Sequence, residues 1–377
     1  MPVRDLVVRR AAPALAAFAA VRLTVLATLA VWGRVVGEDA HTRLAARWDS
    51  LWYARIAADG YGYQVALPNG DVHADLAFFP LLPWLERGVA AVTGLGYGDA
   101  GLVVSAVAGC AAAIGLYALC EHLWGRGTGA RAGVLAAALW AALPVGIVQS
   151  MAYSEALFTA LAVWSLYGAL RGHWLWAGLL AAGAGLTRPV GAAVVAGVWL
   201  AGLLAWRAGR GSWRTAAGLL LAPAGAAGYV LWVGARTGGG LFGYLDVQGG
   251  WGNGFDGGAA FARFLVRLAG SGPAGAVGAV GLALGVALVV AGLVWCARSR
   301  LPAPLVLFAG IVVALALCAS GYFGSKPRLL LPAFPLVLPP ALALARARRG
   351  WAVGVPVALT VVAAGYGAFW LMGSGPP

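Results

Sequence analysis

Apolar segments long enough to cross a lipid bilayer recur along almost the whole chain, and they limit its fold more than any other feature. Hydrophobic residues make up 62% of the 377 residues, and charged residues only 10%. Soluble domains carry about a quarter charged residues. Together with a mean hydropathy of +0.84, these values predict an all-α polytopic membrane protein.

The apolar runs predict about eleven transmembrane helices, within a range of about ten to twelve, in a single domain over residues 1–377. The expected spans are 11–36, 99–120, 132–149, 155–170, 174–188, 191–206, 215–234, 273–296, 302–320, 329–345 and 351–372. The first is too long for the apolar core of a signal peptide and further spans follow, so we expect it to stay uncleaved. Residues 76–95 are interrupted by prolines and charges, which is typical of a helix at the membrane interface.

Arginines are distributed unevenly between the two sides of these spans. If the N-terminus is cytoplasmic, that side carries 14 basic residues and two acids, Asp5 and Glu121, whereas the other side carries 11 of each. The 14 are Arg4, Arg9, Arg10, Arg126, Arg131, Arg171, Arg207, Arg210, Arg214, Arg298, Arg300, Arg346, Arg348 and Arg349. This asymmetry follows the positive-inside rule, so we expect a multi-pass protein of the cell membrane with a cytoplasmic N-terminus. The net charge of +13 therefore does not indicate nucleic-acid binding.

Two long segments are expected on the extracytoplasmic side, 37–98 and 235–272. The first contains the longest polar stretch in the first half of the chain, Arg47–Pro83, with four aspartates and a dense set of aromatic residues. Carboxylates facing water beside rings at headgroup depth are typical of a substrate site at a membrane surface. Ordinary membrane loops can have the same composition, so both interpretations stay open.

Asp49 has the clearest helical context among these acids. Asp49, Trp52, Tyr53 and Ile56 have the spacing i, i+3, i+4 and i+7, which would place the carboxylate beside aromatic rings on one helix face. Asp49 could instead cap the helix, with Ser50 just inside it. The local pattern does not separate these roles, and one residue can serve both.

Three basic residues stand at expected outer ends of spans. Arg188 lies in GLTRPVG, and Lys326 and Arg328 flank a proline. Cations at that depth can neutralise the phosphate of a lipid substrate, whereas snorkelling or a place at a helix C-terminus is the alternative. Glu155 lies in an apolar run and must be paired or face a cavity, unless it caps a helix with Ser154.

Other signals indicate no special chemistry. The four cysteines lie in apolar runs and are expected to be small packing residues. The four histidines lack ligand spacing, so we expect no metal site. The glycine-rich segment 249–258 follows no strand and is not repeated, which favours a flexible loop. Arg22 lies inside the first span and is costly there unless it faces the bundle or snorkels.

Six short motifs occur in a fixed order along the chain. RWDSLWYARIAADGYGY is followed by AFFPLLP, MAYSEALF, GLTRPVG, VQGGW and KPRLLLPAFPL. Spread from Arg47 to Pro335, they resemble the motifs of the PIG-V-type mannosyltransferases, whose eukaryotic members add the second mannose in GPI-anchor assembly. The chain departs from the usual family pattern at Pro189-Val190, where Ser-Asn is common, and at Leu82, where Tyr is frequent.

The resemblance implies a GT-C glycosyltransferase. Such an enzyme moves a sugar from a polyprenyl-phosphate carrier to an acceptor hydroxyl on the extracytoplasmic face, with inversion at the anomeric carbon. It implies that Asp49 is the general base, and that the lipid-linked sugar, a hexose and preferably mannose, is needed without a further cofactor. We expect a glycolipid, glycan or protein as the acceptor.

The other residues of the expected site fall into two groups. Arg188, Lys326 and Arg328 are expected to hold the donor phosphate, so that cationic stabilisation replaces a general acid. The residues expected at the sugar or acceptor are Trp48, Trp52, Tyr53, Asp75, Glu155, Gln248 and Trp251.

A transporter or flippase of a lipid-linked saccharide is the main alternative. It would explain the spans and the outer cations equally well. Transporters usually place polar coupling residues near the bilayer midplane and contain paired repeats. Here the polar residues gather on one expected face and no convincing repeat is found, so the sequence favours the enzyme.

Overall fold

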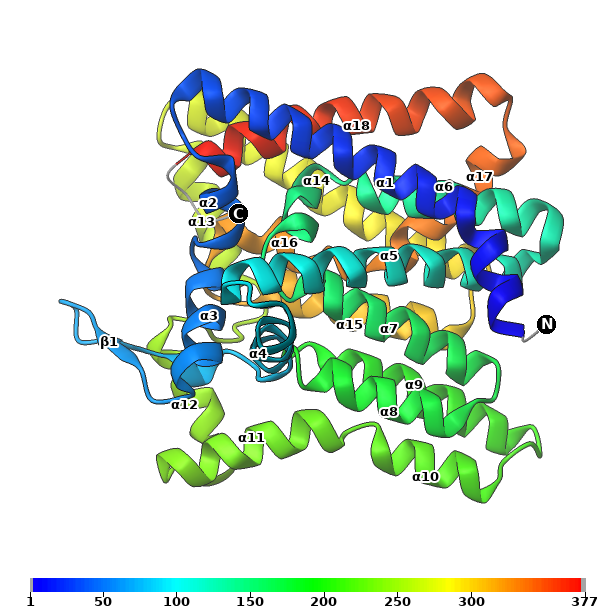
Figure 1. Cartoon of the computed structure of the whole chain (residues 1–377), viewed down its shortest axis with the longest axis horizontal. Coiled ribbons are helices and arrows are strands. Elements are labelled where there is room, and N and C mark those ends of the chain that lie inside the picture. The colour runs from blue at the N-terminus through cyan, green and yellow to red at the C-terminus, as the bar shows by residue number, and fades with distance from the viewer. Residues whose placement is uncertain (1–2, 374–377) are drawn as a thin grey trace.

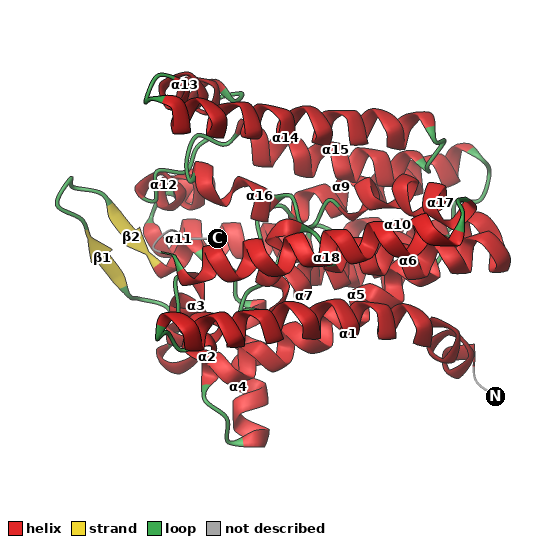
Figure 2. Cartoon of the chain, turned by 90° about the horizontal axis from the view of Figure 1, so that it is seen from above, coloured by secondary structure: helices red, strands yellow, loops and turns green. Residues whose placement is uncertain are grey.

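The computed structural model describes residues 3–373, and almost all of its secondary structure is helical. Long helices run side by side in one bundle, and short helices gather with a β-hairpin at one end of it (Figures 1 and 2). The start of α1 lies at the opposite end of the bundle from this hairpin, as both views show.

The bundle consists of α1 (Val3–Val36), α5 (Tyr97–Trp124), α6 (Ala130–Ala141), α7 (Glu155–Leu170), α8 (Trp174–Gly185), α9 (Gly191–Arg207), α10 (Trp213–Leu221), α11 (Ala224–Thr237), α14 (Pro273–Arg298), α15 (Ala303–Cys318), α17 (Leu338–Arg346) and α18 (Arg349–Met372). The shorter elements are α2 (Ala40–Ala45), α3 (Asp49–Asp59), β1 (Gln64–Ala66), β2 (Val72–Ala74), α4 (Leu81–Thr93), α12 (Gly243–Gly250), α13 (Ala259–Ala269) and α16 (Lys326–Leu329). Short 3₁₀ or π segments link some of the helices: η1 (Asp75–Ala77), η2 (Gly125–Gly129), η3 (Pro144–Ser150), η4 (Gly240–Phe242), η5 (Phe323–Ser325) and η6 (Phe334–Val337).

The length and hydropathy of these helices identify an integral membrane protein. Within residues 3–373, five segments are long and apolar enough to cross a bilayer, and a pair bent by 68° at Leu329–Phe334 would be a sixth. One of the five, Tyr97–Ala141, folds back on itself, because Gly133 of α6 lies directly against Tyr117 of α5. Four further apolar helices are shorter. The count of eleven spans therefore stays a prediction.

Prolines interrupt three of the expected spans. The expected span 132–149 ends as a helix at Ala141 and continues as the η3 turn from Pro144, while 215–234 is divided at Pro223 into α10 and α11. The expected span 329–345 contains the 68° bend between α16 and η6. Proline has no backbone N–H and its ring crowds the preceding turn, so a helix usually breaks or kinks there.

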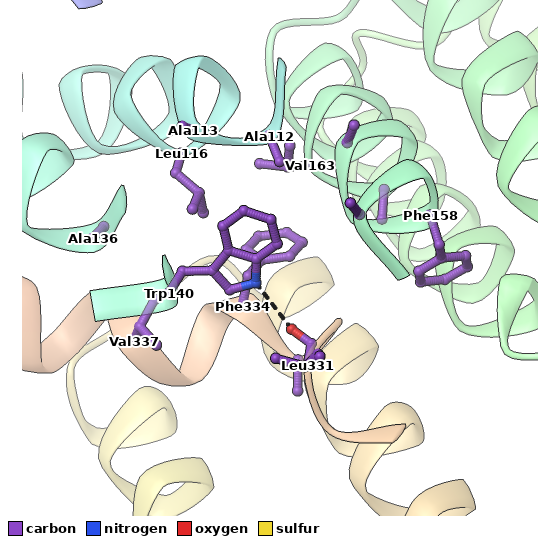
Figure 3. Packing of buried hydrophobic residues seen from close by; sticks show 14 of the residues in the cluster. Ala112, Ala113, Leu116, Ala136, Trp140, Phe158, Val163, Leu331, Phe334 and Val337 are labelled. Atoms are coloured by element: carbon purple, nitrogen blue, oxygen red, sulfur yellow. Dashed lines mark hydrogen bonds between the residues drawn. The ribbon is translucent and has the colours of Figure 1, made fainter. Parts of the chain in front are cut away.

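Small residues let the helices of the bundle approach closely. A Cβ on Gly178 of α8 would collide with the backbone oxygen of Gly218 in α10. Larger side chains fill the remaining space around Trp140, whose indole Nε1–H donates to the carbonyl oxygen of Leu331 at 3.2 Å (Figure 3). Helix association inside a bilayer depends on such van der Waals packing and interhelical hydrogen bonds, since lipid tails are as apolar as leucine.

Arg22 faces the bundle, which is one of the two solutions expected for a charge inside a span. It is 5% exposed, and its Nε–H donates to the Ser150 hydroxyl while its Nη1–H donates to the Ala141 carbonyl. The guanidinium thus satisfies backbone that is left free where α6 ends before Pro144.

Residues 37–98 form a small folded layer at one end of the bundle. Within it, α4 corresponds to the expected interfacial helix. The antiparallel pair β1–β2, with Gln64 opposite Ala74, was not expected from the sequence. Its turn contains Pro68, Asn69 and Gly70, and Gly70 has a φ of 90° that residues with a side chain rarely adopt.

Candidate active site

The Asp49 carboxylate lies at the start of α3 and faces a cavity. Trp48 is the N-cap residue of α3, and no side chain makes a capping hydrogen bond there. The interpretation of Asp49 as the helix cap is therefore wrong. Its Oδ2 lies 2.9 Å from Nη1 of Arg328, and its side chain is 27% exposed, so the carboxylate is both paired and accessible.

The backbone just before Asp49 is strained. Trp48 has φ 52° and ψ −118°, which a residue with a side chain rarely adopts. Arg47 holds this bend: its Nη1–H and Nη2–H donate to the carbonyls of Leu371 and Gly373 at 2.7 and 2.6 Å, and its guanidinium lies 3.8 Å from the Trp48 ring centre. The end of α18 thereby fixes the direction in which α3 starts.

Glu155 connects two arginines behind the cavity. It is the first residue of α7 and is 1% exposed. Its Oε1 lies 2.5 Å from Nη1 of Arg188, in the loop between α8 and α9, and 3.4 Å from Nε of Arg328 in α16. Asp49, Glu155, Arg188 and Arg328 thus form one cluster of two negative and two positive charges.

Hydroxyl groups extend this cluster towards α3. The Arg188 Nη1–H donates to the Ser154 hydroxyl at 3.3 Å, and the hydroxyls of Ser154 and Tyr53 lie 3.0 Å apart. Burial raises the pKa of Tyr53 well above its ordinary value, so this hydroxyl stays protonated. Ser154 makes no capping bond to α7, so the alternative in which Glu155 and Ser154 cap that helix does not hold.

The ion pairs of the cluster are close in distance but poorly aligned as hydrogen bonds. Four atoms are buried without a well-aligned hydrogen-bond partner in the described part of the chain: the two carboxylate oxygens of Glu155, and Nε and Nη1 of Arg328. Of the three guanidinium nitrogens of Arg188, only Nη1 makes a hydrogen bond to a described residue. Buried polar groups normally find partners, so the arginines retain donor capacity for an anion.

The cavity in front of these charges has a volume of about 570 Å³. Asp49, Arg188 and Arg328 line its polar part, and apolar residues of α15 such as Val312 and Leu315 line the rest. This combination of a large apolar wall with a few convergent polar groups is typical of a ligand site.

Aromatic side chains form one wall of this cavity. The Trp52 ring stacks on Phe78 with ring centres 5.5 Å apart and meets Trp251 edge-on at 4.9 Å. Trp251 is fixed on its far side, where it stacks on His73 at 4.1 Å and its Nε1–H donates to the Ala74 carbonyl at 3.0 Å. The β-hairpin therefore supports the wall from outside.

Two amide side chains stand beside the aromatic wall. Gln248 and Asn253 both line the cavity. The Gln248 Nε2–H donates to the Tyr244 hydroxyl at 2.6 Å, and its Oε1 accepts from Nδ2–H of Asn253 at 2.8 Å. These contacts hold both amides in one orientation.

Most of the site residues expected from the sequence meet at this cavity. Those that line it are Trp48, Asp49, Trp52, Tyr53, Arg188, Gln248, Trp251 and Arg328. Glu155, expected as a sugar contact, lies behind Arg188 and Arg328 instead of on the surface of the cavity. Its place next to two guanidinium groups makes it a positioning residue.

Lys326 and Asp75 do not reach the cavity, contrary to expectation. The Lys326 Nζ donates to the carbonyls of Ala316, Leu317 and Ala319, which closes the C-terminal end of α15. Asp75 is fully buried, and its Oδ2 accepts from the backbone N–H groups of Gly62 and Tyr63, both at 2.8 Å. Both charges are used to hold backbone in place.

Four residues with polar side chains that line the cavity, Thr187, Asn253, Tyr322 and Ser325, were not among the site residues expected from the sequence. Tyr322 has a φ of 48°. Thr187 is next to Arg188 and Asn253 is two residues after Trp251, so closeness in the chain to predicted site residues could have indicated them. Nothing in the sequence around Tyr322 marks its unusual backbone. In residues 3–373, no three His, Cys, Asp or Glu side chains are grouped as a metal site requires.

The bundle, its folded end layer and the charged cavity within it define a polytopic helical membrane protein. No family model and no curated protein sequence matches the chain. Its structure is similar to that of ArnT from Cupriavidus metallidurans bound to undecaprenyl phosphate, with a TM-score of 0.53 and 19% identity over 91% of this chain and 63% of ArnT. For ArnT in the apo state the TM-score is 0.52, with 18% identity over 91% and 62% of the two chains.

A weaker likeness, with a TM-score of 0.46, is to the oligosaccharyltransferase of Archaeoglobus fulgidus, at 17% identity over 89% of this chain and 49% of that one. The chain spans less than two thirds of the length of ArnT. At these identities the likeness to ArnT shows the fold alone, and that fold agrees with the expected architecture of a membrane protein built from helices.

Proposed function

We propose that the chain is a glycosyltransferase that moves a hexose, preferably mannose, from a polyprenyl-phosphate donor to an acceptor hydroxyl. The observation that carries the proposal is the accessible Asp49 carboxylate in a cavity that also presents Arg188 and Arg328. An acid and two cations on one cavity supply the two charges that this reaction needs, a base for the acceptor proton and a counter-charge for the leaving phosphate. The undecaprenyl phosphate bound to ArnT supports a lipid phosphate as the ligand of this fold.

The proposed reaction is a single displacement at the anomeric carbon. The acceptor oxygen attacks this carbon, Asp49 takes the hydroxyl proton, and the bond from the anomeric carbon to the phosphate oxygen breaks. The bonding electrons leave with the polyprenyl phosphate, which becomes a phosphate monoester. One displacement inverts the anomeric configuration. A base positioned in this way contributes roughly 10²- to 10⁴-fold to the rate.

Arg328 would have two tasks in this reaction. At 2.9 Å from Asp49 it pairs with the carboxylate of the base, and its poorly aligned contacts leave donor capacity for a phosphate oxygen. Arg188 would bind the same phosphate through the N–H groups that have no partner within residues 3–373. Glu155 would keep both guanidinium groups apart and oriented.

The aromatic wall would bind the sugar. A pyranose has apolar C–H faces that pack against indole rings, and its hydroxyls need hydrogen-bonding groups at the rim. Trp52 and Trp251 offer the rings, while Gln248 and Asn253 offer amides held in one orientation. The apolar side of the cavity along α15 would accept the first isoprene units of the donor.

Three finer parts of the proposal rest on the sequence. The ordered motifs from Arg47 to Pro335 support mannose and a PIG-V-like enzyme. The excess of arginine at the other end of the bundle supports an extracytoplasmic site with a cytoplasmic N-terminus. A glycolipid, glycan or protein would serve as the acceptor.

Reconstitution tests this function against the flippase alternative. The purified chain in vesicles is given radiolabelled polyprenyl-phosphate mannose together with a panel of hydroxyl acceptors. We expect label to move to an acceptor without net translocation of the lipid, and to stay on the donor with the Asp49→Asn variant. Translocation without transfer would overturn the proposal, and transfer from a glucose donor in preference to mannose would overturn only the assignment of the sugar.

A further inference from the structure

A second cavity lies at the end of the bundle opposite to the candidate active site. Its volume is about 620 Å³, and it is formed where α7 and α9 end and where α8, α10 and α15 begin. Helix α15 lines both cavities, with Ala303 at this one and Val312 and Leu315 at the first, whereas α7 runs from Glu155, behind the first cavity, to Leu170 at this one. At 1.5 Å per residue, the length of α7 separates the two sites by about 24 Å.

Three arginines converge on this second cavity without a counter-charge. Arg171 lies in the turn after α7, Arg210 in the turn after α9, and Arg214 in the first turn of α10. Among the described residues, no acid lines the cavity and none of the three arginines forms an ion pair. A concave site whose charged lining groups are all cations has a strongly positive potential, so an anion is the ligand that it fits.

The backbone around these arginines is fixed by local turn chemistry. Gly172 and Gly209 have φ values of 76° and 70°, which close the turns after α7 and α9. Gly211 lies so near the Trp206 ring that a Cβ there would collide with it. Ser212 forms a capping box with Thr215 at the start of α10. The cationic side chains therefore extend from positions that are set before any ligand arrives.

Two exposed tryptophans beside the cavity are typical of the depth of lipid headgroups. Trp206 and Trp213, which flank the turn that carries Arg210, are 44% and 69% exposed, and exposed tryptophans concentrate at the membrane interface. Leu204 and Pro304 add an apolar lining to the arginines. A phosphate at this depth would meet the guanidinium groups while an attached hydrocarbon lay against the apolar part.

We propose that this cavity, lined by Arg171, Arg210 and Arg214, is a binding site for the phosphate group of an anionic ligand, supplied by a phospholipid headgroup or by free phosphate. Guanidinium groups bind phosphate oxygens through paired N–H donors, and basic pockets between transmembrane helices bind anionic headgroups. The proposal does not depend on the glycosyl transfer proposed above, because the two sites share no residue.

Native mass spectrometry of the delipidated full chain tests the site. The protein in detergent is titrated with phosphatidylglycerol, with phosphatidylcholine as the zwitterionic control and inorganic phosphate as the competitor. We expect one phosphatidylglycerol to bind that phosphatidylcholine does not displace. The triple variant Arg171→Gln, Arg210→Gln, Arg214→Gln should bind it at least about tenfold more weakly, because each charge-assisted contact is worth about tenfold or more in affinity.

A matched variant separates this cavity from general surface charge. Arg126→Gln, Arg131→Gln, Arg298→Gln removes three exposed arginines from the same end of the bundle, and none of them lines the cavity. This control should bind phosphatidylglycerol as the unchanged chain does. The single change Arg210→Gln, at an exposed side chain, replaces the triple variant if that protein does not fold.

The competitor identifies the source of the phosphate. Displacement by inorganic phosphate assigns the site to a free phosphate group, whereas resistance to it assigns the site to a lipid headgroup. Equal binding by the unchanged and cavity variants, or an equal loss in both triple variants, would overturn the proposal.

Discussion

Four charged side chains decide what the candidate active site can do. Asp49 and Glu155 balance Arg188 and Arg328, and Glu155 is almost completely buried. Removing one member leaves a buried charge without its partner, which typically lowers the free energy of unfolding by several kcal/mol. Substitutions that keep shape or charge therefore separate chemistry from folding better than alanine does.

Asp49→Asn should abolish most of the transfer activity while the protein stays folded. Asn has the size of Asp but cannot take the acceptor proton, so transfer should fall roughly 10²- to 10⁴-fold. Donor binding should persist or strengthen, because a negative charge next to the phosphate is lost. Transfer rate and donor affinity are measured with purified protein, and Asp59→Asn at the exposed end of α3 is the control. A fully active Asp49→Asn enzyme would contradict the mechanism.

Arg188→Lys and Lys326→Met should affect different properties. Arg188→Lys keeps the charge next to Glu155 but loses the guanidinium fork, so donor affinity should fall by about 10-fold or more with little loss of stability.

Lys326→Met leaves three carbonyls at the end of α15 without their donor, so it should lower the thermal midpoint and leave donor affinity unchanged. Titration of both variants with polyprenyl phosphate, together with thermal unfolding, checks this; a weakened donor affinity in Lys326→Met would restore its expected phosphate role.

At the scale of elements, the sequence predicted which segments form the site, but not the direction of every side chain or the β-hairpin. Asp49, Arg188 and Trp251 were found because rare polar and aromatic residues mark the ends of apolar runs. Lys326 was misplaced because it and Arg328 are two residues apart on α16, which turns their side chains about 200° from each other. Charge and position in a motif do not reveal which of two such neighbours faces the cavity. The β-hairpin was missed because its strands have only three residues each.

The packing of α4 against α5 contains a second measurable feature, the buried carboxyl group of Glu86. It is fully buried, and both oxygens lack a hydrogen-bond partner in the described residues. Burial raises the pKa of Glu86 from 4.5 to about 9, so the folded chain holds a proton here that the unfolded chain has released. The stability of the fold is therefore highest below pH 4.5 with respect to this group and falls as the pH rises towards 9.

Glu86→Gln should remove this dependence, since the amide has the shape of the neutral acid and does not ionise. The slope of stability against pH between 5 and 9 should become shallower by up to about 1.4 kcal/mol per pH unit. Thermal unfolding of both proteins across this range measures it, with the exposed Asp59→Asn as the matched carboxyl control. Parallel curves for Glu86→Gln and the unchanged chain would show that Glu86 is ionised in the folded state.

At the scale of the whole molecule, the two ends of the bundle differ in kind. One end carries the folded layer of residues 37–98 and the cavity with Asp49, and the other carries the turns rich in arginine. The structure confirms that the polar motifs expected on one side lie at one end of the bundle. Which end faces the cytoplasm follows only from the distribution of arginine. This orientation matters because it decides whether a lipid-linked sugar outside the cytoplasm can reach Asp49.

Labelling of single cysteines in a cysteine-free background tests that orientation. Asn69→Cys lies in the exposed turn of the β-hairpin near the candidate active site, and Gly127→Cys lies in the exposed η2 turn at the opposite end, where a side chain has open space. We expect an impermeant thiol reagent to label Asn69→Cys in intact cells and Gly127→Cys only after permeabilisation. A reporter that is active only in the cytoplasm should likewise be active when it is fused after Arg210 or Arg349. The reverse pattern would place Asp49 on the cytoplasmic side, where nucleotide-activated sugars are present, and would remove the reason for a lipid-linked donor.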